Sequence, residues 1–211
     1  MKKVEHGKTF DRNAANPPAF EIFHNTVTEG YPEHWHTAIE IIMPTRGEYE
    51  VVVGKDSYNL KEGDIIMINS GVVHGMRFVS QGERIVMLVE PGCVENQEEM
   101  ETIFLRLPAI YFKKEDEEDP FYLFLRSQIL ELVREYDNEG AVMTHRICTG
   151  LKELFSEFGR KGFSDANAQN TFGAMKQQEY IEAVLSACRY INVHYMENLS
   201  CLLYTSPSPR D

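Results

Sequence analysis

The sequence predicts an all-β barrel or sandwich of antiparallel strands, followed by a helical pair and one further C-terminal helix. Short β-rich runs fill residues 20–91, and a glycine stands at nearly every turn between them. The hydrophobic period then changes to that of amphipathic helices, and a polar segment separates the last helix from the pair. With 211 residues, 43% of them hydrophobic, the chain can bury a core without disulfides or metals.

The charge balance excludes one class of function for this stretch of chain. Its 33 Asp and Glu outnumber its 21 Lys and Arg, which gives a net charge of −12. Nucleic-acid affinity depends largely on Lys and Arg that neutralise phosphates, so these residues predict a poor DNA binder. Because the sequence shows neither a membrane span nor a secretory signal, we expect a cytoplasmic protein without a membrane partner. Its four cysteines are scattered, which is typical of free thiols in a reducing compartment.

The β-rich part of the chain begins after an extended arm. Residues 1–19 carry few apolar side chains and are expected to form this arm, and residues 20–92 are expected to form the barrel. Its predicted strands are Phe20–Val27, Ala38–Met43, Glu48–Val53, Asp64–Asn69, Val72–Val79 and Arg84–Val89. Short strands at such spacing, without a helical period between them, are typical of an antiparallel barrel or sandwich.

Residues 93–161 are predicted to contain the helical pair. Asp119 is expected to cap the first helix, with Pro120 at its first position. One face of this helix carries Phe121, Leu125, Gln128, Leu132 and Tyr136, and one face of the second carries Cys148, Leu151, Phe155 and Phe158. Both faces are expected to pack on the barrel, and apolar positions beside them predict a dimer contact through this region.

The remainder of the chain divides into three predicted parts. Residues 162–174 are expected to be a linker. Residues 175–200 are expected to be a helix whose apolar face carries Ile181, Val184, Cys188, Ile191 and Tyr195. Residues 201–211 resemble a translated sequencing adapter at the end of a fragment and are expected to take no part in the fold; a natural disordered tail is the alternative.

One histidine-rich segment carries the side chains best suited to chemistry. On an extended strand side chains alternate between faces, so His34, His36 and Glu40 are expected to share one face. Trp35 lies on the other face and is expected to pack beneath the helical pair. His74 follows a glycine-rich turn, and a neighbouring strand is expected to bring it to the first three. Three imidazoles and one carboxylate suit Fe, Mn, Ni, Cu or Zn.

These residues resemble the two motifs of the cupin superfamily. The first motif is matched at His34, His36, Glu40 and Gly47, and the second at Gly63, Gly71 and His74. Asn69 and Phe78 depart from the second motif, which has Pro and Asn there. The resemblance implies a cupin jelly-roll barrel whose ligand-binding residues are His34, His36, Glu40 and His74. Two alternatives stay open: these four hold one divalent transition metal, or they line a polar pocket without any cofactor.

The chain as a whole resembles the AraC/XylS family of transcriptional regulators. Its C-terminal helix ends in a pattern of that family, carried by Tyr190, Ile191, His194, Tyr195, Asn198, Leu199 and Ser200. The resemblance implies a small-molecule effector in the barrel, such as a sugar or another metabolite, and a homodimer through the helical pair. It also implies that DNA is bound only by helix-turn-helix units after Ser200, in whose first helix this fragment is cut.

On this interpretation the chain is not an enzyme, and no catalytic residue is predicted. It would be the ligand-sensing and dimerising region of a regulator. One alternative is a stand-alone metal-dependent cupin enzyme, an oxygenase or an isomerase, in which a bound metal keeps an open position for substrate. A third interpretation is a binding or dimerisation module without activity.

Overall fold

The computed structural model describes residues 19–26, 30–90, 109–116, 118–138 and 140–161, together with Ala187, Tyr190 and His194. The chain divides into two compact units, residues 1–169 and 170–211. Ala187, Tyr190 and His194 are helical and lie within the predicted C-terminal helix. The predicted arm before Ala19, the linker at 162–174 and the tail at 201–211 lie outside the described residues.

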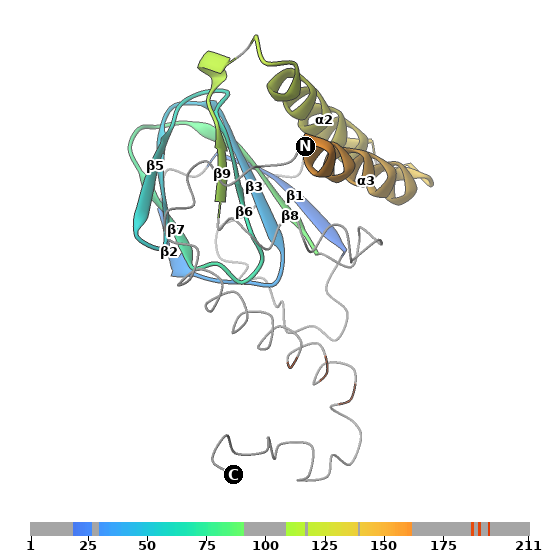
Figure 1. Cartoon of the computed structure of the whole chain (residues 1–211), viewed down its shortest axis with the longest axis horizontal. Helices are drawn as coiled ribbons and strands as arrows, with labels where there is room; N and C mark the ends of the chain where they lie inside the picture. The colour runs from blue at the N-terminus through green and yellow to red at the C-terminus, as the bar shows by residue number, and fades with distance from the viewer. Residues whose placement is uncertain are drawn as a thin grey trace. The chain divides into compact units, whose positions relative to one another are not determined.

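Two antiparallel sheets face each other in the first unit (Figure 1). The strands that the structure describes are β1 (Phe20–Asn25), β2 (Tyr31–His34), β3 (Ile39–Arg46), β4 (Tyr49–Val53), β5 (Asp56–Leu60), β6 (Ile65–Ile68), β7 (His74–Phe78), β8 (Glu83–Val89) and β9 (Ala109–Phe112). One sheet has the order β1-β8-β3-β6-β9 and the other β2-β7-β4-β5. We call the first the helix-covered sheet and the second the open sheet. This jelly-roll arrangement confirms the predicted antiparallel barrel or sandwich.

The sequence pattern does not predict β2, β5 or β9. β2 is short, contains Pro32 and is largely exposed, and β5 is mostly polar, so neither shows an apolar alternation. β9 corrects a predicted boundary, because it lies within 93–161 and yet pairs with β6, with Tyr111 opposite Ile66. β9 is placed at the edge of the sheet by its pairing with β6. A run of only four residues is too short to show a periodicity that would predict this strand.

The helix-covered sheet buries both of its faces. On β3, Ile39, Ile41 and Met43 face the helices, whereas Ile42 faces the open sheet. The core between the sheets consists of Ile42, Tyr49, Val51, Val53, Leu60, Ile66, Ile68 and Met76. Burial on both faces explains why β6 is a continuous apolar run and why β3 is apolar from Ile41 to Pro44, with the buried Glu40 as a polar exception.

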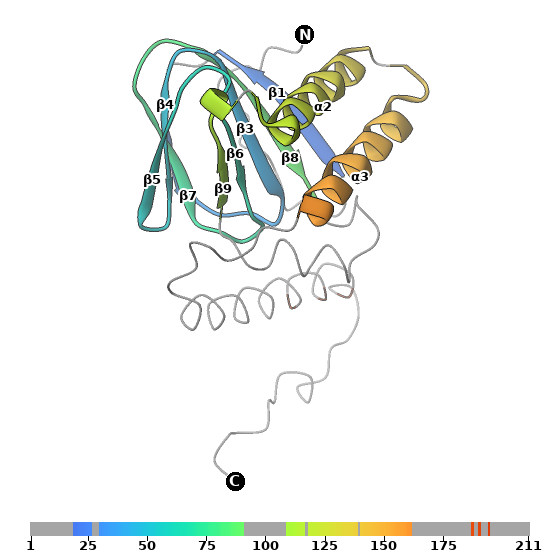
Figure 2. The ribbon, with the colours of Figure 1, turned by 45° about the horizontal axis from the view of Figure 1, so that its top comes forward.

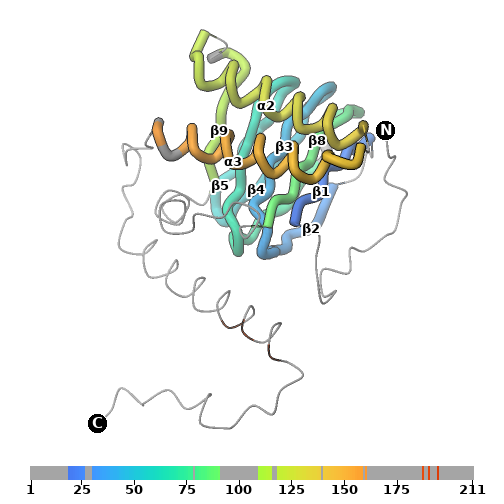
Figure 3. Tube along the Cα trace, turned by 90° about the vertical axis from the view of Figure 1, so that its right-hand side faces the viewer, coloured from blue at the N-terminus to red at the C-terminus, as the bar shows by residue number. Residues whose placement is uncertain are grey.

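The helices α2 (Pro120–Asp137) and α3 (Met143–Lys161) cover the outer face of this sheet, as Figure 2 shows. The Phe121 N–H donates to Asp119 Oδ1 at 2.8 Å, and Pro120 begins α2, which confirms the predicted cap. The buried helical side chains that meet the sheet are Tyr122, Leu125, Ile129, Leu132, Ile147, Leu151, Leu154, Phe155 and Phe158. In Figure 3 both helices lie across the strands of the sheet that they cover.

Neither of the two described helices is long and apolar enough to cross a membrane.

We expect Leu125→Ala to lower the free energy of unfolding by about 2 to 5 kcal/mol, because it leaves a cavity between α2 and the sheet. Leu125 is 1% exposed. The neighbouring Arg126 is exposed, so Arg126→Ala should change stability by less than about 0.5 kcal/mol. Urea denaturation of both variants measures the difference. Equal stability of the two would contradict the packing of α2 on the sheet.

Candidate metal centre

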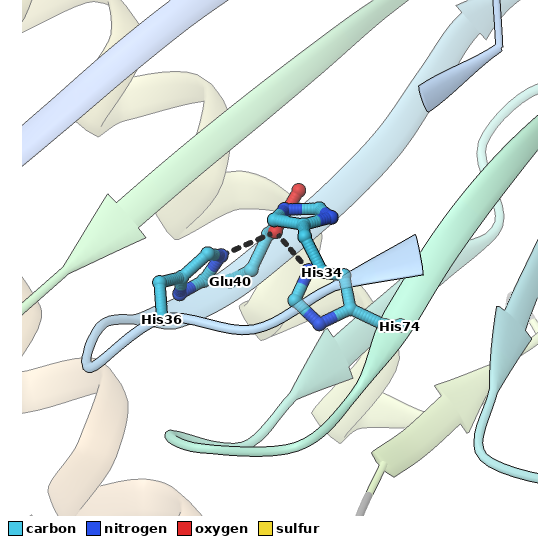
Figure 4. A group of neighbouring side chains, drawn as sticks. All are labelled: His34, His36, Glu40 and His74. Atoms are coloured by element: carbon cyan, nitrogen blue, oxygen red, sulfur yellow. Dashed lines mark hydrogen bonds and ion pairs between the residues drawn. The ribbon is translucent and has the colours of Figure 1, made fainter. Parts of the chain in front are cut away.

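His34, His36, Glu40 and His74 come from both sheets and from the chain that crosses between them (Figure 4). His34 ends β2, His74 begins β7, and the two are cross-strand partners. Glu40 lies on β3 in the helix-covered sheet, and His36 lies in the connection from β2 to β3. One ligand atom from each residue can be chosen so that all four lie within 4.8 Å of one another. The structure therefore brings the four predicted site residues together.

The reason for this convergence differs from the predicted one. The segment is not one extended strand, because it leaves the open sheet after His34 and enters the helix-covered sheet at Ile39. Glu40 approaches the centre from one sheet and His34 from the other. Trp35 lies in the crossing and is 50% exposed, so its predicted packing beneath the helices is wrong. A change of sheet interrupts the alternation of faces on which both predictions depended.

Two glycines allow the histidine-bearing segments to approach each other closely. Gly71 has a φ of 74°, which favours glycine, and its N–H donates to the His36 carbonyl at 2.8 Å. A Cβ at Gly75 would lie 3.2 Å from the Tyr31 carbonyl oxygen and 3.2 Å from the Glu33 nitrogen. Glycine at this position therefore lets β2 lie against β7, where His34 meets His74.

Each of the three histidines donates its Nδ1 proton to a backbone carbonyl two residues away. The distances are 3.0 Å from His34 to Pro32, 3.0 Å from His36 to Ala38 and 2.8 Å from His74 to Val72. Because a carbonyl oxygen can only accept, Nδ1 carries the proton and a neutral ring keeps its lone pair on Nε2. Metal-binding histidines are commonly held in this way.

Glu40 Oε2 faces two of these rings, at 3.0 Å from His36 Nε2 and 2.8 Å from His74 Nε2 (Figure 4). With the proton on Nδ1, a neutral ring would present a lone pair to a carboxylate oxygen, which also only accepts. The contact therefore requires either a second proton on each ring or a cation shared by the ligands. Glu40 and His74 are buried, so the cluster has little access to water as an alternative partner.

The surroundings favour an ionised Glu40 and a neutral His34. Burial by itself would raise the pKa of Glu40, but the hydrogen bonds with His36 and His74 outweigh it and hold this pKa well below its ordinary range. Burial and the neighbouring His74 lower the pKa of His34. A carboxylate and a neutral imidazole are the forms that bind a metal.

The donor set fits one first-row divalent transition metal. Ligand atoms bound at about 2.1 Å lie about 3 to 4 Å apart around such an ion. The two contacts of Glu40 already have this spacing, and the whole set spans no more than 4.8 Å. His34 is partly exposed, so the centre can be reached from its side. Whether these residues bind a metal or an organic ligand stays a prediction.

Neither of two pockets beside the sandwich is lined by these four residues. One, of about 470 Å³, lies beside β2 and β7, and the other, of about 680 Å³, lies beside β5 and β9. The next inward-facing residues from the centre, Ile42 on β3 and Met76 on β7, belong to the packed core between the sheets. A ligand at this centre would therefore bind at one end of the sandwich.

The sequence patterns do not predict two further features of the sandwich. Arg84 on β8 is 3% exposed, with its guanidinium carbon 4.8 Å from the centre of the Tyr49 ring. Burial lowers the pKa of Arg84, while Tyr49 and Glu40 oppose this shift. Alternation along β8 could have placed Arg84 on the inward face. The second feature is a hydrogen bond between Thr37 and Glu90, which no sequence pattern indicates.

A family model described as a cupin domain matches residues 25–90, and the cupin fold is thereby confirmed. Among solved structures, a ToxT variant from Vibrio cholerae is 10% identical with a TM-score of 0.48, covering 80% of this chain and 66% of that one. A conserved protein of unknown function from Streptococcus pyogenes is 18% identical with a TM-score of 0.31, covering 34% and 63%. An oxalate decarboxylase from Bacillus subtilis with Mn(II) centres is 19% identical with a TM-score of 0.30, covering 33% and 20%. The chain spans less than two thirds of the length of each, and no curated protein matches it.

We expect the affinity of this centre for Ni²⁺ to fall as the pH is lowered. Protons and the metal compete for the same Nε2 atoms. Because its pKa is lowered, His34 should contribute to the loss only at a lower pH than an exposed histidine. Calorimetric titrations at about pH 7.5, 6.5 and 5.5 measure this. An affinity that is independent of pH would contradict binding through the imidazoles.

Proposed function

We propose that this chain is the metal-binding, effector-sensing and dimerising region of a transcriptional regulator that resembles the AraC/XylS family. The observation that carries the sensing function is the set of four donors, in which three Nδ1 atoms are committed to backbone carbonyls while Glu40 and the Nε2 atoms converge. A divalent metal bound there would supply a Lewis-acid site for an oxygen or nitrogen atom of a small effector.

The residues of the centre have separate tasks in this proposal. The partly buried His36 and the buried His74 are two of the nitrogen donors, and Glu40 supplies the negative charge that a divalent cation needs. His34 completes the set on the partly exposed side. The ring of Tyr31 lies 4.6 Å from that of His34 and is itself half exposed, so an effector that approaches from this side would contact it.

The helices support the regulatory part of the proposal. The inner faces of α2 and α3 pack on the sheet, but Leu123 and Leu130, seven residues apart on α2, are 51% and 39% exposed. An apolar pair on one helix face suits a contact with a second copy of the chain. In this proposal the protein is a cytoplasmic homodimer without a membrane partner.

The C-terminal unit carries the resemblance to the DNA-binding region of the family. The aromatic rings of Tyr190 and His194, which lie one helical turn apart, stack with their centres 4.3 Å from each other. DNA would be bound by helix-turn-helix units beyond Ser200, so the net charge of −12 of this chain agrees with the proposal.

A metal-dependent cupin enzyme, an oxygenase or isomerase, is the second candidate. The partly exposed His34 favours it, because a metal that is reached from one side can keep a position open for substrate. The two candidates share the metal centre but differ in the helices. A sensor must transmit its state through a dimer, whereas turnover at the metal needs no contact between helices.

We expect the protein to retain about one equivalent of Mn²⁺, Ni²⁺ or Zn²⁺ after loading and dialysis, and His74→Ala to retain less than about a tenth of an equivalent. The matched control is His24→Ala, since His24 lies on β1 with its Nε2 3.8 Å from Glu83 Oε2 and outside the group of four. Elemental analysis of the purified proteins measures the content. Equal metal in both variants, or none in the unmodified protein, would refute the metal centre.

We expect the protein to be a dimer that Leu130→Glu converts to a monomer, because a charge on the exposed face of α2 opposes an apolar contact. Val79→Glu is the control, since Val79 is also exposed, at 53% against 39% for Leu130, but belongs to the β sandwich and not to α2. Sedimentation velocity measures the mass of each. A monomeric parent protein, or a dimer that survives Leu130→Glu, would count against dimerisation through this face.

A further inference from the structure

Glu90 joins three segments of the chain at one end of the helix-covered sheet. It follows β8, and its N–H donates to the Ala19 carbonyl at 2.9 Å, immediately before β1. Its carboxylate oxygens accept from Thr37 Oγ1 at 2.9 and 3.1 Å. Thr37 lies between His36 and Glu40 in the crossing from the open sheet. Glu90 therefore links the crossing that carries His36 to the ends of β1 and β8.

Two further hydrogen bonds of the crossing lead to the loop that precedes His74. Ser70 Oγ donates to the Thr37 carbonyl at 2.5 Å, and the Gly71 N–H donates to the His36 carbonyl at 2.8 Å. These two bonds hold the crossing against the loop between β6 and β7. That loop starts from the helix-covered sheet, where Ile68 of β6 pairs with Glu40. The Thr37–Glu90 bond adds a separate tie, from the crossing to the end of β8 in the same sheet.

A centre assembled from two sheets depends on such a connection, because ligands must be held to within about 0.5 Å. His36 Nε2 belongs to the crossing and Glu40 Oε2 to the sheet, and their 3.0 Å contact exists only while these two parts keep their places. We propose that Glu90 is a positioning residue for the metal centre, which acts through Thr37 to place His36 relative to Glu40. This inference rests on the proposed metal-binding function.

The coupling must act in both directions. If the Thr37–Glu90 bond strengthens metal binding, then a bound metal stabilises the hydrogen bonds of Glu90 with Thr37 and Ala19 by the same factor. The Glu90 N–H, which donates to the Ala19 carbonyl, belongs to this set of hydrogen bonds. Its hydrogen exchange should therefore slow when metal binds, although the amide is not at a ligand residue.

The test compares Ni²⁺ affinity in the full chain with three changes: Thr37→Val, Glu90→Ala and Glu90→Gln. Loss of hydrogen bonds that support metal ligands weakens binding about 10- to 100-fold, so we expect about tenfold weaker binding for Thr37→Val and Glu90→Ala. Glu90→Gln keeps an oxygen that can accept from Thr37 and should restore most of the affinity. A double variant with Thr37→Val and Glu90→Ala should bind no more weakly than either single variant, because each change removes the same Thr37–Glu90 hydrogen bond.

Glu83→Ala is the matched control. Glu83 begins β8, its carboxylate forms an ion pair with Arg46 at 3.2 Å, and its loss changes the net charge as Glu90→Ala does. We expect less than about a twofold change in its Ni²⁺ affinity, because it lies at the opposite end of the strand from the centre. The absorption spectrum of bound Co²⁺ gives a second readout, which should change for Thr37→Val and not for Glu83→Ala.

Several outcomes would overturn the proposal, and they separate it from the metal centre itself. Affinity and Co²⁺ spectrum unchanged in Thr37→Val would remove the positioning role while leaving the centre in place. Additive losses in the double variant, or equal slowing of the Glu90 amide in the parent protein and in Thr37→Val, would do the same. A parent protein that binds neither Ni²⁺ nor Co²⁺ overturns both. Should Glu90→Ala not fold, the near-isosteric Thr37→Val carries the comparison.

Discussion

The buried carboxylate of Glu40 is the group on which the arrangement of the site depends. It stands on the inward face of β3, where the next inward residue, Ile42, belongs to an apolar core. An unpaired charge there would be costly, and here the Nε2 atoms of His36 and His74 lie 3.0 and 2.8 Å from it, where ring protons or a shared cation compensate it. His36 lies in the crossing and His74 begins β7, so the charge that the sheet buries also determines where these two segments must lie.

The helix-covered sheet can carry a buried carboxylate because its two faces differ: the outward face packs against the helices, and the inward face meets the open sheet. The outward residues of β3 pack beneath α2 and α3, which supply a large apolar core and hold the sheet in place. The inward face is then free to combine a packed core with one polar end.

Local patterns predicted much of this molecule, and long-range contacts account for what they missed. Asp119 and Pro120 specify the start of α2 through bonds within one turn, so their prediction is confirmed. The four site residues were found from their types and spacing, but the assumption of one strand through His34 and Glu40 was wrong. Neither the change of sheet at Trp35 nor the bond from Thr37 to Glu90 leaves a local signal, since each depends on how distant strands pack.

A cation at this centre would act as a cross-link between the sheets as well as a binding site. His34 and His74 stand on paired strands of the open sheet, whereas Glu40 stands on the other sheet. Binding energy gained by joining them would favour one relative placement of the sheets over others. The metal centre is also connected to the ends of β1 and β8 through the hydrogen bonds of Glu90 with Thr37 and Ala19. Because β8 and β1 also pack under the helices, occupancy at one end of the sandwich has a continuous physical route to the surface proposed for dimerisation.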